Sequence, residues 1–263
     1  MNIWHMSGAG NTFAVLDARG RILDFPKLAK SLCAQLKTDG LLAVDASEIA
    51  DFRLHFYNAD GSRGEMCGNG ARCVCKFAFD RGLAGEKMVV QTDAGFVYGE
   101  RLDSETYRVQ LNNPGVLDLH RLEDTAYVEL GNPGVPHSVT QWDGLDFSQK
   151  EELRTQFLQL RHSAAFPKGV NVNFYSRLGE NHVRVLTYER GVEDFTQACG
   201  TGSASVAVVL WVTGQLPGGV LKAENQGGML KIEIIGKAPD VEKIYLEGPA
   251  VLLREYTNFW REL

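Results

Sequence analysis

The chain has 263 residues, of which 44% are hydrophobic and 23% are charged, and its formal net charge at pH 7 is −6. This composition is typical of a folded, water-soluble protein with room for two domains, and it excludes extensive disorder. The acidic balance, without a run of Lys or Arg, excludes a nucleic-acid partner. No apolar run reaches the roughly 20 residues of a membrane helix and no signal-peptide pattern is present, so we expect no membrane association and a cytoplasmic protein.

Strand patterns dominate the chain, and four helical patterns interrupt them. From the N-terminus we expect a helix at about residues 26–37, a half-buried strand at 52–57 and a second helix at 71–80. A third helix follows at about 148–160 and a strand at 183–186. The last elements are a fourth helix at 203–212 and a strand at 230–234. This succession predicts a mixed α/β (α+β) fold.

An internal repeat connects the two halves of the chain. Residues 66–82 match residues 198–214 without a gap, at an offset of 132 residues, and the same offset places Gly95 on Gly227. The matched pairs in the first stretch are Cys67 and Cys199, Gly68 and Gly200, Gly70 and Gly202, Val74 and Val206, and Gly82 and Gly214. Both halves share the order strand, turn, Cys-Gly-x-Gly and helix, which indicates duplicated domains. We expect one domain at residues 1–113 with about 250–263, and the other at 114–249.

Cys67 and Cys199 are the candidate catalytic residues, because each precedes a helical pattern directly. At a helix N-terminus, unpaired backbone N–H groups and the helix dipole stabilise anions, so we expect a lowered thiol pKa and amides that bind a carboxylate. Two such cysteines on opposite faces of one α-carbon can invert it: a thiolate removes the α-proton and a thiol delivers a proton to the other face. This chemistry does not strictly require a cofactor.

Other readings of the cysteines and glycines have weaker support. Residues 61–70 contain neither a complete P-loop nor a dinucleotide fingerprint. Cys67, Cys73 and Cys75 include no Cys-x-x-Cys pair, so we expect no metal site and no cofactor. The odd total of five cysteines argues against a disulfide framework. Cys33, Cys73 and Cys75 are expected to pack in the interior.

Two motifs carry a resemblance to a known family. The segments Glu-Met-Cys-Gly-Asn-Gly-Ala-Arg-Cys at 65–73 and Ala-Cys-Gly-Thr-Gly at 198–202 resemble diaminopimelate epimerase, with further agreement at 8–11, 58–62, 169–174, 188–191 and 248–250. The resemblance implies two pseudo-symmetric domains, each a mostly antiparallel curved sheet around a central helix, with the active site between them. It also implies a homodimer that interconverts L,L- and meso-2,6-diaminopimelate, for lysine and peptidoglycan-precursor biosynthesis, without pyridoxal phosphate or metal.

The resemblance also assigns roles to individual residues, with Cys67 and Cys199 as base and acid. The implied substrate-binding residues are Asn11, Asn58, Gly68, Asn69, Asn171, Glu189, Arg190, Gly200 and Thr201. The planar guanidinium of Arg190 suits bidentate binding of a distal carboxylate. Glu189 either holds the distal ammonium group or tunes the thiols, and His137 resembles a family histidine that lies near them. Taken singly, an Arg beside a turn is a solvated charge and an Asn is a turn residue.

Several positions depart from the family pattern, namely Ser7, Thr12, Gly40 and the segment 131–137. That segment is stretched. Aligning it on His137 puts Val135 where the family has a binding Asn, whereas aligning it on Gly131 keeps Asn132 and displaces His137.

Two alternatives to diaminopimelate epimerisation therefore remain open. One keeps the chemistry and changes the substrate to another amino acid, such as histidine or proline. The other is a non-catalytic redox or ligand-binding protein whose helix-terminal thiols form a reversible disulfide.

Overall fold

The computed structural model describes residues 1–64, 66–257 and 259. Contacts divide the chain into two compact units. The first contains Met1–Gln110 together with the C-terminal residues from Gly248 onward, and the second contains Leu111–Glu247. Glu65, the first residue of the first cysteine motif, lies outside the described residues.

Four α-helices lie at the places that the sequence predicts. They are α1 (Phe25–Leu36), α2 (Gly68–Asp80), α3 (Lys150–Arg161) and α4 (Gly200–Val212), with short 3-10 helices η1 (Phe147–Gln149) and η2 (Pro217–Gly219). Helices α2 and α4 begin three residues earlier than predicted, at the glycine directly after each cysteine. The cysteines are therefore the N-cap residues themselves.

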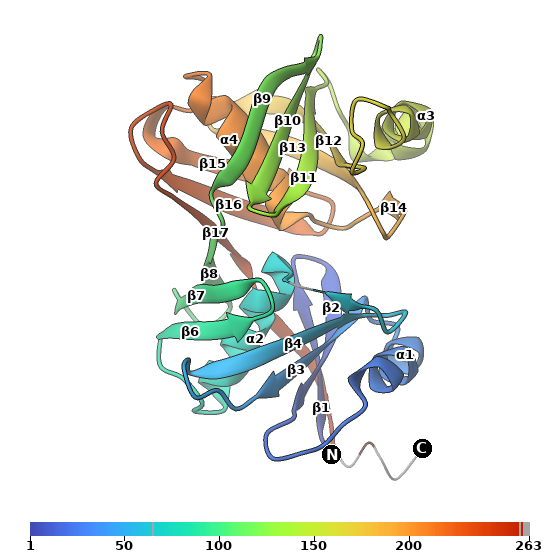
Figure 1. Cartoon of the computed structure of the whole chain (residues 1–263), viewed down its shortest axis with the longest axis vertical. Helices are drawn as coiled ribbons and strands as arrows, with labels where there is room; N and C mark the ends of the chain where they lie inside the picture. The colour runs from blue at the N-terminus through green and yellow to red at the C-terminus, as the bar shows by residue number, and fades with distance from the viewer. Residues whose placement is uncertain (65, 258, 260–263) are drawn as a thin grey trace. The chain divides into compact units, whose positions relative to one another are not determined.

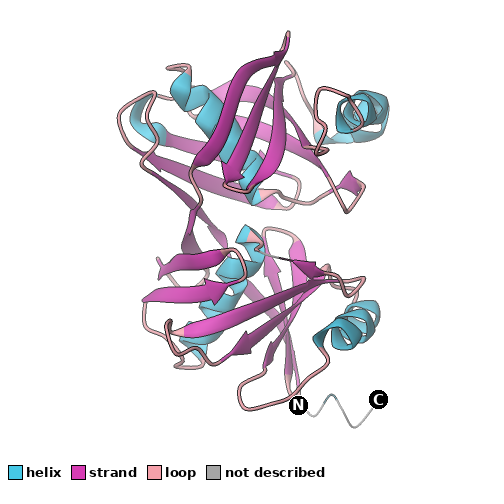
Figure 2. Cartoon of the chain, in the orientation of Figure 1, coloured by secondary structure: helices cyan, strands magenta, loops and turns pink. Residues whose placement is uncertain are grey.

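The remaining elements are strands, so the predicted mixed α/β fold is confirmed (Figure 2). The strands of the first unit are β1 (Ile3–Gly8), β2 (Asn11–Asp17), β3 (Gly40–Asp45), β4 (Phe52–Asn58), β5 (Arg63–Gly64), β6 (Lys87–Thr92), β7 (Gly95–Arg101), β8 (Thr106–Leu111) and β18 (Val251–Tyr256). Those that follow β8 are β9 (Pro114–Leu122), β10 (Thr125–Gly131), β11 (Gly134–Gln141), β12 (Asn171–Gly179), β13 (His182–Glu189), β14 (Asp194–Phe195), β15 (Val220–Asn225), β16 (Gly228–Ile235) and β17 (Lys243–Pro249).

The two units have the same strand topology. In the first, β1 pairs antiparallel with β2, β2 parallel with β3, β3 antiparallel with β4, β4 parallel with β6, and β6 antiparallel with β7. In the second, the same sequence of pairings runs through β10, β11, β12, β13, β15 and β16. The repeat seen at the cysteine motifs therefore extends over six strands of each unit.

The pairing corrects one detail of the sequence repeat. Thr92 pairs with Gly95 across the β6–β7 turn, and Asn225 pairs with Gly228 across the β15–β16 turn. Gly95 is thus equivalent to Gly228 and not to Gly227. The second unit therefore has one residue more than the first between its central helix, α4, and this hairpin. Both equivalent glycines have a positive φ, which the hairpin turn requires.

In each unit the helix that follows the cysteine is central to the fold. Helix α2 packs against β1, β2, β3 and β7, and α4 packs against the equivalent strands β10, β11, β12 and β16 (Figure 1). Cys73 and Cys75 on α2 have no exposed surface. Burial raises the pKa of both thiols to about 12, which confirms them as packing residues. Cys33, buried on α1, is the third such thiol.

Helices α1 and α3 are amphipathic, and each covers its sheet with one face. The buried face of α1 contains Leu28, Ala29, Leu32 and Cys33, at the spacing of one helical stripe. Helix α3 buries only Leu153 and Phe157. Each of these helices is thus held to its sheet by a single apolar stripe.

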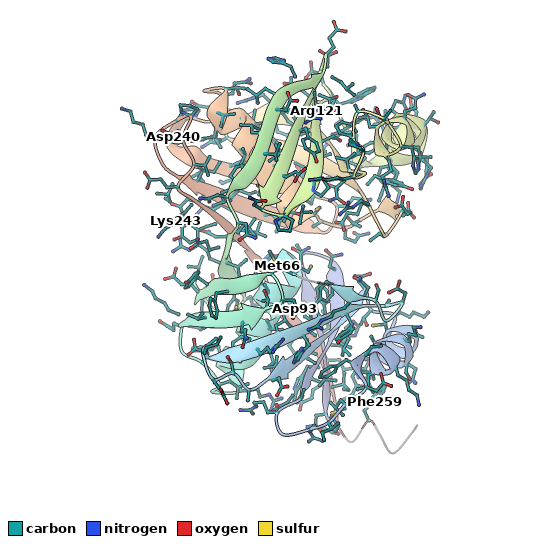
Figure 3. The ribbon with its side chains drawn as sticks, viewed as in Figure 1. Met66, Asp93, Arg121, Asp240, Lys243 and Phe259 are labelled. Carbon is teal, nitrogen blue, oxygen red and sulfur yellow. The ribbon has the colours of Figure 1, made fainter. Side chains whose placement is uncertain are left out.

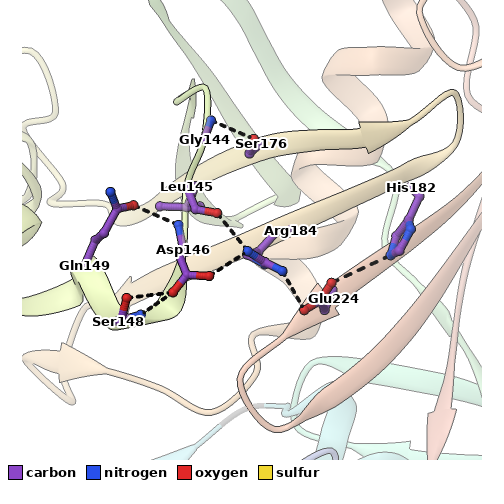
Figure 4. A network of polar contacts seen from close by, with 9 residues as sticks. All are labelled: Gly144, Leu145, Asp146, Ser148, Gln149, Ser176, His182, Arg184 and Glu224. Atoms are coloured by element: carbon purple, nitrogen blue, oxygen red, sulfur yellow. Dashed lines mark hydrogen bonds and ion pairs between the residues drawn. The ribbon is translucent and has the colours of Figure 1, made fainter.

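Arg184 on β13 fixes the segment that leads into α3 (Figure 4). Its guanidinium donates hydrogen bonds to the Leu145 carbonyl at 3.1 Å, to the Asp146 carboxylate at 2.9 Å and to Glu224 on β15 at 3.1 Å. Asp146 in turn caps η1 by accepting a hydrogen bond from the Ser148 backbone N–H. The network joins two strands of the sheet to the start of a helix that has few apolar contacts of its own.

Candidate active site

Cys67 occupies the N-terminal end of α2, where Figure 3 labels the preceding residue, Met66. The Ala71 N–H donates to the Cys67 carbonyl at 2.7 Å, which is the first hydrogen bond of the helix. The Cys67 residue is partly exposed, whereas Gly68 and Asn69 behind it are buried. Helix geometry leaves the first backbone amides without acceptors inside the helix. The first cysteine loop, residues 67–70, therefore presents a thiol beside amide donors.

Asn11 lies beside this loop and contacts Asn69 within it. Asn11 begins β2 after a two-residue turn, and its Oδ1 accepts a hydrogen bond from Asn69 Nδ2. A Cβ atom at Gly8 would lie only 2.7 Å from the Asn69 carbonyl oxygen, so the hairpin approaches the helix closely because Gly8 has no side chain. The structure thus brings two of the predicted binding residues into contact.

Asn58 and Gly40 pair with each other between β4 and β3. Asn58 is exposed, and its Nδ2 donates to Ser62 Oγ at 2.9 Å. A Cβ atom at Gly40 would lie 2.8 Å from Phe56 Cε2 and 2.8 Å from the Tyr57 carbonyl oxygen. The aromatic ring of Phe56 thus occupies the space into which a larger side chain at position 40 would extend.

Cys199 occupies the equivalent position at the start of α4. Its Sγ accepts a hydrogen bond from the Gly202 backbone N–H at 3.3 Å and lies 3.6 Å from Thr201 Oγ1. The residue is only 7% exposed. The second cysteine loop, residues 199–202, therefore caps its helix through sulfur, and the Gly200 and Thr201 amides remain without acceptors inside the helix.

The structure corrects the expected pKa of the Cys199 thiol. Burial raises this pKa well above its usual value, and the nearby negative charge of Glu189 raises it further. The Thr201 and Gly202 hydrogen bonds act in the opposite direction and do not compensate. The prediction of a lowered pKa was therefore wrong for Cys199, because the helix N-terminus competes with desolvation and with a carboxylate. Glu189 ends β13, and its Oε1 accepts from Thr196 Oγ1 at 2.8 Å.

Asn171 and Arg190 are joined by a hydrogen bond. Asn171 Oδ1 accepts from the Arg190 backbone N–H at 2.8 Å, and Asn171 Nδ2 donates to the Pro136 carbonyl at 3.0 Å. The Arg190 Nη1 donates to the Lys168 carbonyl at 2.7 Å. Asn171 therefore holds the backbone at Arg190 in place, and a hydrogen bond to Lys168 anchors one end of the Arg190 guanidinium.

His137 lies in β11 and has no exposed surface. Burial lowers its pKa to about 3, with the Arg190 charge contributing, so the ring is neutral at physiological pH. The Nδ1 atom lies 3.2 Å from Asn173 Nδ2, which must act as the donor, and this assigns the ring proton to Nε2. Asn132 falls in the turn between β10 and β11, whereas Val135 is the second residue of β11 and is 39% exposed.

Two residues that contact the cysteine loops, Asn173 and Arg72, were not assigned a role from the sequence. Asn173 is fully buried, and its amide nitrogen donates to the Ser138 carbonyl at 2.8 Å while its oxygen accepts from Thr187 Oγ1 at 2.9 Å. The alternation Asn171-Val172-Asn173 on a strand was a usable signal, since residues two apart share a face. Arg72 is the other, and it is also fully buried.

The described residues contain no group of three or more His, Cys, Asp or Glu side chains arranged to hold a metal ion. In the same part of the chain, no helix combines the length and apolar character needed to cross a membrane.

A family model described as diaminopimelate epimerase matches residues 3–114 and 130–253, which include both cysteine loops. The chain belongs to the diaminopimelate epimerase family. It is accordingly an isomerase, and the resemblance seen in the cysteine motifs is confirmed.

Relatives named diaminopimelate epimerase match nearly the full length of the chain. The protein of Methanothrix thermoacetophila is 37% identical over 271 residues, covering 94% of this chain and 91% of that protein. The protein of Aquifex aeolicus is 32% identical over 266 residues, covering 94% of each chain.

Solved structures of differently named proteins have a similar fold. A PhzF-family phenazine biosynthesis protein from Bacillus anthracis has a TM-score of 0.73 at 16% identity, covering 97% of this chain and 98% of that chain. A probable proline racemase from Agrobacterium radiobacter K84 has a TM-score of 0.70 at 15% identity, covering 97% of this chain and 92% of that chain. At these identities the similarity shows the fold alone.

Proposed function

We propose that this protein interconverts L,L- and meso-2,6-diaminopimelate by a two-base reaction in which Cys67 and Cys199 are the acid and base. The observation that carries the proposal is the matched placement of the two thiols, each the N-cap of the central helix in one of two topologically equivalent units. Family membership supplies the substrate, since the matching relatives are named for it.

The reaction moves one proton at a time between sulfur and carbon. A thiolate takes the α-proton, and the electrons of the C–H bond pass to the α-carbon and its carboxylate. The other thiol then delivers its proton to the opposite face of that carbon and becomes the thiolate. Each turnover therefore exchanges the roles of Cys67 and Cys199, without a redox step and without a cofactor.

The backbone amides and polar side chains around the two loops supply binding and charge stabilisation. We assign the substrate α-carboxylate to the backbone amides of Gly68, Asn69, Gly200 and Thr201, which helix geometry directs outward. Charge develops on this carboxylate as the proton leaves, so preorganised donors stabilise the transition state more than the ground state. Asn11, which is bonded to Asn69, extends this set of polar groups in the first unit.

Arg190 is the proposed binding site of the distal carboxylate. Its Nη1 donates to the Lys168 carbonyl, which anchors one end of the guanidinium, and the residue is exposed, so we assign the remaining N–H groups to the ligand. Asn58 contributes an exposed amide, and Asn171 fixes the backbone of Arg190. Glu189 either binds the distal ammonium group of the substrate or tunes Cys199, whose thiol pKa it raises.

Incubation with L,L-diaminopimelate in deuterium oxide tests the chemistry. The meso product should contain deuterium at the inverted α-carbon, and no cofactor should need to be added. Meso product that forms without solvent deuterium contradicts the two-base reaction. A panel of L-amino acids followed by chiral chromatography tests the substrate, and turnover of histidine or proline in preference to diaminopimelate contradicts that part of the proposal.

Assembly as a homodimer and a location in the cytoplasm complete the proposal, and both are supported by the family resemblance. Light scattering coupled to size-exclusion chromatography should give twice the mass of the 29.0 kDa chain. Fractionation of the source cells should recover the protein with the cytoplasmic enzymes.

A further inference from the structure

Arg72 is a charged residue in the interior of the first unit that the proposed reaction does not use. Its side chain has no exposed surface. The guanidinium donates to Asn69 Oδ1 at 2.8 Å, to the Gly68 carbonyl at 3.4 Å and, 177 residues away in the sequence, to the Pro249 carbonyl at 3.4 Å. Two of these three acceptors belong to the first cysteine loop. Arg72 therefore lies directly behind the N-terminal end of α2.

The hydrogen bonds that Arg72 makes to described residues do not neutralise its charge. Its hydrogen-bond acceptors are two carbonyl groups and one amide oxygen, and none of them is a carboxylate. Burial lowers the pKa of Arg72 to about 10, so the guanidinium remains protonated at pH 7. An isolated charge in the interior is costly unless an opposite charge lies nearby. A compensating anion is therefore expected close to α2.

Among the described residues, thiols are the groups that can become anions and that interact with Arg72. Cys67, Cys73 and Cys75 interact electrostatically with the guanidinium, and no Asp or Glu of the described part of β1, β2, β3 or β7 does so. The pKa values of Cys73 and Cys75 are raised to about 12 by burial, so both stay neutral at pH 7. Cys67 is the thiol that remains, and it is partly exposed at the helix N-terminus.

The second unit has the opposite electrostatics. The residue equivalent to Arg72 is Ala204, which is fully buried on α4 and carries no charge. The charged group that acts on Cys199 is instead the Glu189 carboxylate, which disfavours a second negative charge beside it. Among the described residues, the charged group that interacts with Cys67 from its own helix is thus a cation, Arg72, whereas the charged group that acts on Cys199 is an anion, Glu189.

We propose that Arg72 is a positioning residue that makes Cys67, rather than Cys199, the thiolate of the resting protein. The inference rests on the proposed two-cysteine function and adds the direction in which the pair is charged before substrate binds. Its hydrogen bond to Asn69 Oδ1 has a second effect, since it orients the Asn69 amide so that Nδ2 points to Asn11. Arg72 contacts neither the substrate nor the reacting atoms, and it acts through the loop.

Thiol labelling without substrate tests this assignment. In a Cys199→Ser background, the rate at which iodoacetamide alkylates Cys67 is followed by mass spectrometry from about pH 5 to about pH 10, because only the thiolate reacts. Arg72→Met should raise the midpoint by about one pH unit or more, which slows labelling at pH 7 about tenfold. Arg72→Lys keeps the charge and should recover most of the rate. The matched control is Arg72→Met in a Cys67→Ser background, where the labelling of Cys199 should not change.

An unchanged midpoint in a folded Arg72→Met protein overturns the proposal, as does an equal shift in the Lys and Met variants, which would show a role for shape and not for charge. If the Met variant does not fold, Arg72→Lys decides alone: the proposal fails if its midpoint rises as far as a full unit. A raised KM with unchanged labelling assigns the Arg72 charge to the substrate carboxylate and also overturns it. Labelling needs no turnover, so a protein inactive on diaminopimelate refutes the proposed function without affecting this result.

Discussion

Adding one methyl group at Gly202 tests how closely the second cysteine loop is packed. A Cβ atom there would lie 2.2 Å from Asn173 Oδ1. Non-bonded atoms in contact stay about 3.5 Å apart, so one of the two groups must move by more than about 1 Å. Asn173 is held by Ser138, His137 and Thr187, and moving it would leave buried polar groups unsatisfied. The start of α4 must therefore shift instead.

The magnitude follows from two opposing effects. Overpacking costs about 1–3 kcal/mol, while replacing Gly by Ala within a helix returns up to about 1 kcal/mol. Because Asn173 cannot move without losing its hydrogen bonds, the overpacking cost should lie in the upper part of its range. We therefore expect Gly202→Ala to lower the free energy of unfolding by about 2 kcal/mol. For a protein of this size that lowers the Tm by about 4–8 °C. The Gly202 N–H also binds Cys199 Sγ, so kcat/KM should fall with it.

Gly70→Ala is the matched control, because Gly70 has the equivalent position in α2. A Cβ atom there would meet Leu42 Cδ2 at 3.0 Å, which is the end of a flexible side chain that can move by a few tenths of an ångström. We expect its stability to stay within about 1 kcal/mol of the parent protein. Differential scanning calorimetry of both variants measures the contrast, using the first transition because two units need not unfold together. Equal Tm values for the two variants would refute the reasoning.

Three further predictions concern charge and binding. His137 has a pKa of about 3 in the folded protein, so it is neutral there at pH 6.5, whereas in the unfolded chain it binds a proton below about pH 6.5. The free energy of unfolding should therefore decrease as the pH falls below about 6.5, by up to about 1.4 kcal/mol per pH unit. His137→Asn should reduce that slope in pH-dependent urea unfolding, and an unchanged slope contradicts the assignment. Arg190→Lys should raise the KM for diaminopimelate about tenfold or more with little change in kcat, because the anchored guanidinium that can bind a carboxylate through two N–H groups is lost. An unchanged KM in steady-state kinetics contradicts the proposed role of Arg190. Glu189→Gln should lower the pKa of Cys199, so alkylation of that thiol at a fixed pH should become faster, and a slower or equal rate contradicts the electrostatic role of Glu189.

Local patterns in the sequence were sufficient for the helices and for the position of the thiols. The spacing of Leu28, Leu32 and their neighbours determines which face of α1 is buried. A cysteine followed by Gly-x-Gly and an apolar run defines a helix start, and the structure has Cys67 and Cys199 at both N-caps. These features depend on residues within one or two helical turns of each other, and that information is contiguous in the chain.

Burial and contacts between distant segments decided the rest. The pKa of Cys199 rises because the folded sheet excludes water around it and because β13 brings Glu189 close, and neither effect can be calculated from the motif. Arg72 donates a hydrogen bond to the Pro249 carbonyl, 177 residues away in the sequence. The 2.2 Å approach at Gly202 depends on Asn173, which lies on β12, well before α4 in the sequence. The sequence by itself determined which groups could carry the chemistry. Only the tertiary structure decided their charge states, because desolvation and long-range Coulomb interactions depend on everything that packs around a group.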